Sequence, residues 1–442
     1  MFEVLKNFLG GNSGLVGSQS LKSVAGVDTA ISQKMLAAQC KWREMYEEKS
    51  GLHLASAISF EMARMVTLDL RSKVTGSKRG EFLDKTYQKL VENIRIPVEY
   101  GCAKGGLVIK PYVCKNELKV DFIQGDSFFP TEFDESGNIL GAVFVQSIAG
   151  KGEYFTRLER HRKTKDGYEI SNRAFKSKSS GVLGCEIPIG EVPWWRDMAE
   201  NVVIANVDKP LFGYFRPAAA NTIDPSSPIG VSVFANAVNL IEDANRQYER
   251  LLWEFESGER ALIANSMAFK HDREGRPKLP DKRLYRTLDV EDIDFFREWS
   301  PQLRGVDIAD GLDKIFRRIE FNCGFAYGTL SNIDGRDRTA EEIRSSKQRS
   351  YATISDNQKA LKNALTDAVY AMDVWCTLYN LAPMGEFSVS FEFDDSIAAD
   401  RKTEFEEKCI MLDKGVMQPW EIRMWYFGED EETAKQKCKK IN

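Results

Sequence analysis

The stretch GFAYGTLSNIDGRDRTAEE, residues 324–342, decides how this chain is organised. Its three glycines and its Asn-x-Asp-Gly turn indicate a mobile loop. Thr339 has the side chain of an N-cap residue, and Glu342 three residues later completes a capping box. We therefore expect a loop over residues 325–338 that leads directly into a helix.

The helix after this loop is predicted to be unusually long. No proline or glycine interrupts it until Pro383. About 40 helical residues would extend for roughly 60 Å. Its apolar residues recur at steps of three, four or seven, at Ile354, Leu361, Leu365, Ala368, Met372, Trp375 and Tyr379. A compact monomer rarely covers so long a stripe, so we expect a partner to cover it, most simply a second copy of the chain.

A shorter helix is expected before the loop, within residues 301–324. Its apolar face is marked by Ile308, Leu312, Ile315 and Ile319. Aspartates lie in its first half and arginines in its second, as the helix dipole favours. The alternative interpretation is two core helices joined by an ordinary loop.

The length, net charge and composition of the chain limit the class of protein it can be. The chain has 442 residues, enough for two or three domains, and a net charge of −5. So small a charge argues against a wide basic face that grips nucleic acid, though not against a protein that surrounds it loosely. No apolar run is long enough for a membrane span, and the first ten residues do not resemble a signal peptide. The eight cysteines form no CxxC pair, so we expect buried thiols in a reducing compartment rather than zinc ligands.

In the first half of the chain, the spacing of apolar residues changes from a helical to a strand pattern. Residues 1–30 are small, polar and rich in glycine, which indicates a flexible N-terminal arm. Apolar spacing predicts helices over residues 31–95. The periodicity changes at Pro97, and short strands are expected at 107–109 and 118–122, followed by a hairpin with its turn at 134–138. Residues 97–220 are therefore expected to form a β-rich domain built from hairpins.

A turn cluster at residues 224–230 is predicted to launch another long helix, which Gly258 ends. The helix has a near-heptad stripe at Phe234, Val238, Ile241, Tyr248, Leu252 and Phe255. Asn245 interrupts this stripe, and a polar residue in such a seam usually fixes register or partner number. Acidic residues outnumber basic ones over 242–260, for which the alternative interpretation is a solvated helix face.

An insert at residues 259–300 separates this helix from the one before the loop. It contains a basic, proline-containing stretch between two expected strands. Three strands are expected in the second half of the chain, over residues 261–264, 284–288 and 387–393. Two helices are expected to close it, over about 397–414 and 419–440.

The sequence contains no recognisable catalytic motif. The patterns GxxxxGK[ST], HExxH, GxSxG and strand-borne GxGxxG are all absent. Glu392, Asp394 and Asp395 allow a metal-dependent nuclease as one alternative, but the simpler interpretation is a turn at a strand end. We expect no catalytic residue, no metal and no cofactor.

Several stretches, taken together, resemble the portal proteins, or head-to-tail connectors, of tailed bacteriophages. These are FFPTEFDESGNI at 128–139, YFTRLERH at 154–161, PAAAN at 217–221, SPIGVSVFANA at 227–237, TAEEI at 339–343 and FEFDDS at 391–396. Their order and spacing are most similar to the type found in long-tailed phages of Gram-positive hosts. The resemblance extends from about Trp42 to the C-terminus.

The resemblance implies an α+β portal fold. Such a fold has a helical and then β-rich wing, a two-helix stem, a small β-containing clip, a tunnel loop, a long wing helix and a helical crown. The corresponding ranges are 1–30 for the flexible arm, 31–227 for the wing, 228–257 and 301–324 for the stem helices, 258–300 for the clip, 325–338 for the tunnel loop, 339–394 for the long wing helix and strand, and 395–442 for the crown.

The function implied is that of a ring, usually dodecameric, at one capsid vertex. It conducts double-stranded DNA during packaging and ejection, and it is not an enzyme. Implied partners are further copies of itself, duplex DNA without sequence specificity, the terminase large subunit, a head-completion or neck adaptor, and the major capsid and scaffolding proteins, with no membrane. The implied location is the virion, after assembly in the host cytoplasm. The alternative is another oligomeric neck or scaffold protein of the virion that never contacts DNA.

Three groups of residues would carry this function. Acidic stem helices would repel the DNA backbone and let it slide, while loop arginines touch phosphates briefly. The tunnel-loop residues would be Asn332, Asp334, Arg336 and Arg338. The channel-facing stem residues would be Glu249, Glu254 and Glu256, and the partner-docking clip residues would be Arg276, Lys278, Lys282 and Arg283. The alternative for the two arginines is pairing with Asp334, Asp337 or a neighbouring subunit.

Overall fold

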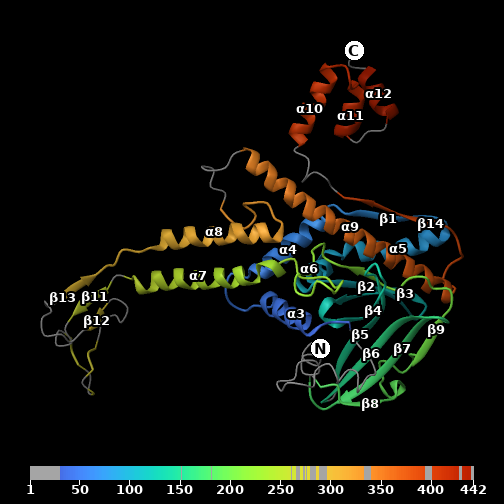
Figure 1. Cartoon of the computed structure of the whole chain (residues 1–442), viewed down its shortest axis with the longest axis horizontal. Helices are drawn as coiled ribbons and strands as arrows, with labels where there is room; N and C mark the ends of the chain where they lie inside the picture. The colour runs from blue at the N-terminus through green and yellow to red at the C-terminus, as the bar shows by residue number, and fades with distance from the viewer. Residues whose placement is uncertain are drawn as a thin grey trace.

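The computed structural model describes residues 30–442 except 151, 181, 260, 265–268, 272–273, 275, 279–284, 288–295, 333–339, 394–400, 428–430 and 440–442. A broad body of helices and sheets carries a projecting pair of antiparallel helices, with a small sheet at the far end of that pair (Figure 1). Three short helices at the C-terminus form a separate group beside the body (Figure 1). Helices and separate, mainly antiparallel sheets confirm the expected α+β class.

The body begins with helices, as predicted for residues 31–95. They are α3 (Gln33–Tyr46), α4 (Leu54–Thr67) and α5 (Lys78–Glu92). A further helix, α6 (Arg95–Lys104), crosses Pro97, where we expect the β-rich region to begin, and the first strands follow it at the expected places. The change from helix to strand comes later than predicted because Pro97 lies in the first turn of α6, where a backbone N–H has no helical acceptor to lose.

A strand within the helical region is not predicted by the sequence pattern. It is β1 (Arg71–Gly76), and it pairs antiparallel with β14 (Phe387–Glu392), which corresponds to the strand expected at 387–393. The hydroxyl of Ser72 donates to the Ser390 carbonyl at 2.7 Å across 318 residues of sequence. A pairing over such a distance leaves no local signature.

Two antiparallel sheets make up most of the rest of the body. Three strands, β2 (Leu107–Cys114), β3 (Glu117–Gln124) and β10 (Gly213–Phe215), pair in the order β10-β2-β3. Six strands form the larger sheet, in the order β4-β5-β6-β7-β8 with β9 also on β7. They are β4 (Phe128–Phe133), β5 (Ile139–Gly150), β6 (Glu153–Thr164), β7 (Gly167–Ser177), β8 (Cys185–Ile187) and β9 (Asn201–Ile204). The predicted hairpins are confirmed, and short 3-10 turns lie at Gly125–Ser127 and Ile189–Glu191.

The long helix α9 (Ala340–Leu378) confirms the predicted length. Its apolar stripe, however, needs no second chain over the body. Leu361, Leu365 and Met372 are fully buried against β2, β10 and α4 of the same chain. The strand β10 passes so close beneath the helix that a Cβ on Gly213 would lie 1.9 Å from the Ala364 carbonyl oxygen. The expectation of an intermolecular cover is therefore wrong here, because the sheet supplies the apolar surface.

The projecting pair, which we call the stalk, consists of α7 (Val238–Ser257) and α8 (Gly305–Cys323). We expect the first of these helices from residue 228, but apart from a 3-10 turn at Ala235–Ala237 the helix begins ten residues later. Residues before it are held against α6 instead. The Val233 N–H donates to the Cys102 carbonyl at 2.9 Å, and Phe234 is completely buried.

Asn245 anchors the stalk to the body of its own chain. Its side-chain oxygen accepts from the Leu52 N–H at 3.0 Å, and its amide donates to Glu48 at 2.8 Å. Both partners belong to the connection between α3 and α4. The polar residue that interrupts the apolar stripe therefore holds α7 against the α3–α4 connection. Its hydrogen bonds are made within the chain and not to a second copy.

A three-stranded sheet at the far end of the stalk, which we call the distal sheet, has the order β12-β11-β13. Two of its strands, β11 (Ala261–Ala264) and β12 (Tyr285–Thr287), match predicted ones and run parallel. The third, β13 (Phe296–Trp299), is not predicted and pairs antiparallel with β11.

The chain closes with three helices where two are expected. They are α10 (Arg401–Asp413), α11 (Pro419–Phe427) and α12 (Glu431–Lys439). Gly428, a poor helix former, stands in the sequence between the last two. Each of the eight cysteines is free, and Cys102, Cys323 and Cys376 are buried as expected. Cys185 is exposed instead, and the other four are half-buried.

Candidate functional site

The acidic residues of the stalk do not all face outward. Glu254, expected on the channel side, is buried. Its carboxylate accepts from the Arg304 backbone N–H at 3.0 Å and from the Arg304 guanidinium at 2.9 Å. These hydrogen bonds hold the pKa of Glu254 below its usual value. Glu254 is thus not an exposed acid, because it ties the end of α7 to the residue that precedes α8.

The other two predicted stem acids, Glu249 and Glu256, are exposed on α7. Across both stalk helices nine acidic residues stand against five basic ones. The stalk therefore carries a negative charge, as the sequence analysis expects. Such a surface repels the phosphate backbone of a nucleic acid rather than gripping it.

The far half of the stalk also exposes large apolar side chains. Trp253 is 62% exposed and Val306 is 84% exposed. Leu252, Phe255 and Leu303 are also exposed nearby. A groove of about 590 Å³ runs between the two helices, with Trp253 and Ile308 in its lining. Exposed apolar clusters of this kind mark surfaces that another macromolecule covers.

The loop between α8 and α9 is built on a buried carboxylate. Glu320, in the last turn of α8, is fully buried. One of its oxygens accepts from the backbone N–H groups of Gly328 at 3.0 Å, Leu330 at 2.6 Å and Ser331 at 2.8 Å. The other accepts from the Ser331 hydroxyl at 2.9 Å. We call residues 325–332 the loop root; it is a bonded structure, in contrast to the mobile loop that the glycines predict.

The loop root is also attached to α9. The Arg349 guanidinium lies 4.6 Å from the ring centre of Phe321 and 5.0 Å from that of Tyr327. It also donates to the Phe325 carbonyl at 3.3 Å. Gly324 ends α8 in a left-handed conformation, and a Cβ there would lie 2.4 Å from the Thr353 hydroxyl. The root therefore joins the stalk to the long helix.

Only one of the four predicted tunnel-loop residues lies in the described part of the chain. Asn332 is exposed, and its backbone N–H donates to Asp313 of α8 at 2.7 Å. The other three, Asp334, Arg336 and Arg338, lie outside the described residues, as do the capping residue Thr339 and the side chain of its partner Glu342.

The predicted clip residues are divided in the same way. Arg276 and Lys278 are exposed, and the Arg276 guanidinium lies 3.4 Å from the Glu274 carboxylate. Lys282 and Arg283 lie outside the described residues. An exposed ion pair of this kind contributes little stability.

The nuclease alternative gains no support. Glu392 is exposed at the end of β14, while Asp394 and Asp395 lie outside the described residues. In the part of the chain that the structure describes, no three His, Cys, Asp or Glu side chains gather as metal ligands would. There too, no helix is both long and apolar enough to cross a membrane.

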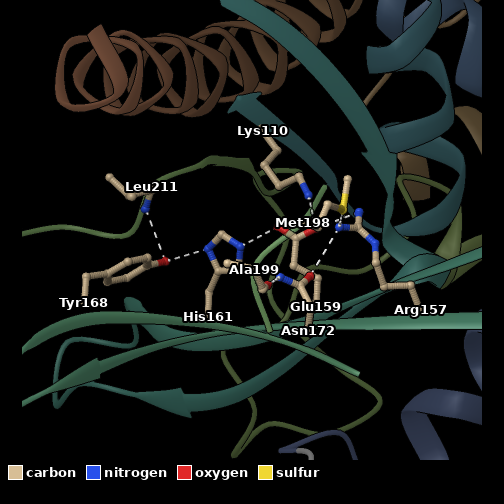
Figure 2. A network of polar contacts seen from close by, with 9 residues as sticks. All are labelled: Lys110, Arg157, Glu159, His161, Tyr168, Asn172, Met198, Ala199 and Leu211. Atoms are coloured by element: carbon tan, nitrogen blue, oxygen red, sulfur yellow. Dashed lines mark hydrogen bonds and ion pairs between the residues drawn. The ribbon is translucent and has the colours of Figure 1, made fainter. Parts of the chain in front are cut away.

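A buried polar network in the body is missed by the sequence analysis. Glu159 of β6 lies between the Lys110 ammonium at 2.7 Å, the Arg157 guanidinium at 3.0 Å and the His161 ring at 2.7 Å (Figure 2). Lys110 comes from β2, so the network joins the two sheets. The available signal is the run of Arg157, Glu159 and His161 at every second position, which puts three polar residues on one face of a strand.

The arrangement resembles a catalytic relay, but it is buried at its Tyr168 end. His161 donates to Glu159 through Nε2 and accepts from the Tyr168 hydroxyl through Nδ1, at 3.0 Å (Figure 2). That hydroxyl accepts in turn from the Leu211 backbone N–H at 3.3 Å. The hydroxyl is fully engaged and buried, so it faces no substrate. The network links the two sheets, and at its other end Lys110, Arg157 and Glu159 line a pocket of about 530 Å³.

The network predicts that acid destabilises the body. Burial lowers the pKa of His161, although Glu159 opposes this. Burial alone would raise the pKa of Glu159, but Lys110, His161 and Arg157 outweigh it and hold that pKa well below its usual range. Because the unfolded chain binds these protons more readily, stability is complete above about pH 6.5 and falls as the pH is lowered. A second loss, from Glu159, begins below about pH 4.5.

The measurement is urea unfolding between pH 7.5 and 5, comparing wild type with His161→Gln. The wild-type free energy of unfolding should fall by up to about 1.4 kcal/mol per pH unit contributed by His161. Gln is neutral throughout, so the variant should show a flatter dependence. Equal slopes for the two proteins would contradict the assignment.

No protein-family model and no curated protein matches this chain.

Proposed function

We propose that this chain is the subunit of a phage portal, a ring that conducts double-stranded DNA through a capsid vertex during packaging and ejection. The observation that carries the proposal is the stalk: an acidic antiparallel helix pair, capped by a small sheet and tied at its base to a long helix. A helix pair arranged around an axis would give a channel wall that repels phosphates, so that DNA slides.

Exposed apolar side chains support assembly into a ring. Trp253 and Val306 lie on a stalk that projects from the body, where neither is covered by the body's own sheets. Neighbouring stalks packed side by side would bury them. In this assembly the chain is not an enzyme, and energy for DNA movement comes from a separate motor.

The other assignments follow from the same proposal. The body would be the wing of the portal and the stalk would be its stem. The distal sheet would be the clip, and α10–α12 would be the crown. The ring, with twelve copies as the usual number, would dock the terminase large subunit and later a neck adaptor through the clip. It would contact the major capsid and scaffolding proteins during assembly in the host cytoplasm, and end at the portal vertex of the virion.

The decisive experiment is negative-stain microscopy of the purified chain. The expected result is a ring with a central hole wide enough for a DNA duplex. A compact single molecule, or a ring closed at its centre, would overturn the proposal.

A substitution on the stalk tests the ring interface. Trp253→Asp should reduce the fraction of chains in rings by about tenfold or more, since a buried charge replaces an aromatic contact. Its thermal unfolding should change little because the side chain is 62% exposed. Met384→Asp, at a position 78% exposed in the body, is the matched control and should assemble normally. Sedimentation of the three proteins separates these outcomes.

Removal of residues 333–338 separates the portal from a neck or scaffold protein that never contacts DNA. This deletion leaves the loop root intact. A portal subunit should still form rings but fill capsids poorly with DNA. Capsids that fill as well as wild type would favour the second function.

A further inference from the structure

The carboxylate of Glu320 is unusual in its surroundings. It is fully buried, and among the described residues no basic side chain forms an ion pair with it. A buried charge without a counter-charge is costly unless hydrogen bonds replace the lost water. Here three backbone N–H groups and one hydroxyl do so, all of them from the loop root.

A second carboxylate on the same side of α8 extends this attachment. Asp313 precedes Glu320 by seven residues, two helical turns, and so lies on the same face. It accepts from the Asn332 N–H at 2.7 Å, just beyond the groups that Glu320 holds. The end of the loop root is therefore folded back along the stalk and bound at two points.

The two carboxylates, Asp313 and Glu320, differ in their hydrogen-bond and ion-pair partners. Asp313 also forms an ion pair with Arg317 at 2.9 Å, so its charge has a partner within the helix. In the described part of the chain, every hydrogen bond that Glu320 accepts comes from the loop root. Hydrogen bonds to a charged acceptor are among the stronger ones in proteins. Glu320 accepts four of them from the loop root and Asp313 accepts one, so Glu320 has the larger influence on the path of the loop.

We propose that Glu320 is a positioning residue: it holds the loop root in one conformation against the stalk and so sets where the loop meets DNA in the channel. This inference rests on the proposed portal function. It assigns Glu320 no contact with DNA, because the side chain is buried. Its effect is transmitted through the backbone of Gly328, Leu330 and Ser331.

The test compares Glu320→Ala and Glu320→Gln with wild type and with the control Glu81→Ala, an exposed glutamate on α5. Amide hydrogen exchange at Gly328, Leu330 and Ser331 should accelerate at least about tenfold in Glu320→Ala. Glu320→Gln keeps an acceptor oxygen of the same reach, so it should be intermediate. The control should match wild type.

The functional readout is nuclease-protected DNA per filled capsid, with ring yield measured by microscopy. Glu320→Ala should form rings in wild-type yield but retain several-fold less DNA, with partial rescue by Glu320→Gln. Retention equal to wild type, or a loss of rings in proportion to the loss of DNA, would overturn the positioning role. If Glu320→Ala does not fold, Glu320→Gln and Ser331→Ala are compared instead, and wild-type retention in both would overturn it.

Failure of the proposed function is recognised separately. If wild-type chains form no ring or fill no capsid with DNA, the portal proposal fails before the variants are compared. If wild type assembles and packages normally, the variants alone decide the role of Glu320.

Discussion

Replacing Glu159 by Leu is expected to lower the free energy of unfolding by about 3–5 kcal/mol. The substitution leaves the Lys110 ammonium without its partner at 2.7 Å, inside a region where that side chain is 8% exposed. Arg157 and His161 lose the same carboxylate. Removal of one member of a buried charge network costs far more than removal of an exposed ion pair.

Two further proteins make this prediction specific. Lys110→Met combined with Glu159→Leu removes both charges of this pair, so it should recover the part of the lost stability that comes from the unpaired Lys110 ammonium. Glu117→Leu removes an exposed glutamate on β3, 3.9 Å from Lys119, and should change stability by less than about 0.5 kcal/mol. Urea unfolding of all three measures the effect. A Glu159→Leu protein as stable as the control would show that the network contributes nothing.

Gly213→Ala is expected to cost about 3 kcal/mol or more, an unusually large effect for one added methyl group. The new Cβ would lie 1.9 Å from the Ala364 carbonyl oxygen and 2.8 Å from its carbon, both in the backbone of α9. Backbone atoms cannot rotate away as a side chain can. The register of Gly213 opposite Ile109 prevents β10 from shifting without breaking its pairs.

Gly190→Ala is the matched control, because a Cβ at Gly190 has no neighbour within 4 Å. Its stability should change by less than about 1 kcal/mol. Thermal unfolding should show a large fall in Tm for Gly213→Ala alone. Equal Tm values for the two variants would mean that α9 moves away from the sheet at little cost.

Local patterns predict the elements of this fold well. The long helix α9 follows from the absence of proline and glycine and from the spacing of Leu361, Leu365 and Met372. The hairpins of β4–β7 follow from alternation and turn residues. Such signals depend on neighbours a few residues apart, so they can be read without knowing what lies across the molecule.

The candidate site is predicted less completely. The acidity of the stalk and the exposure of Glu249 and Glu256 agree with the sequence analysis. Glu254 does not, because its partner Arg304 is 50 residues away and is brought to it by the distal sheet. Glu320 offers no sequence signal at all, since its role depends on the path of the loop around it.

By itself, then, the sequence determined the helices, most of the strands and the charge of the stalk, because these depend on short-range spacing and composition. Only the tertiary structure decided what covers α9, which acids are buried, and that Lys110 meets Glu159. These outcomes depend on which distant segments exclude water from one another. Two glutamates that look alike in the sequence can therefore differ in the structure. One stays a solvated surface charge, and the other is buried where it accepts hydrogen bonds, depending on whether distant segments exclude water from it.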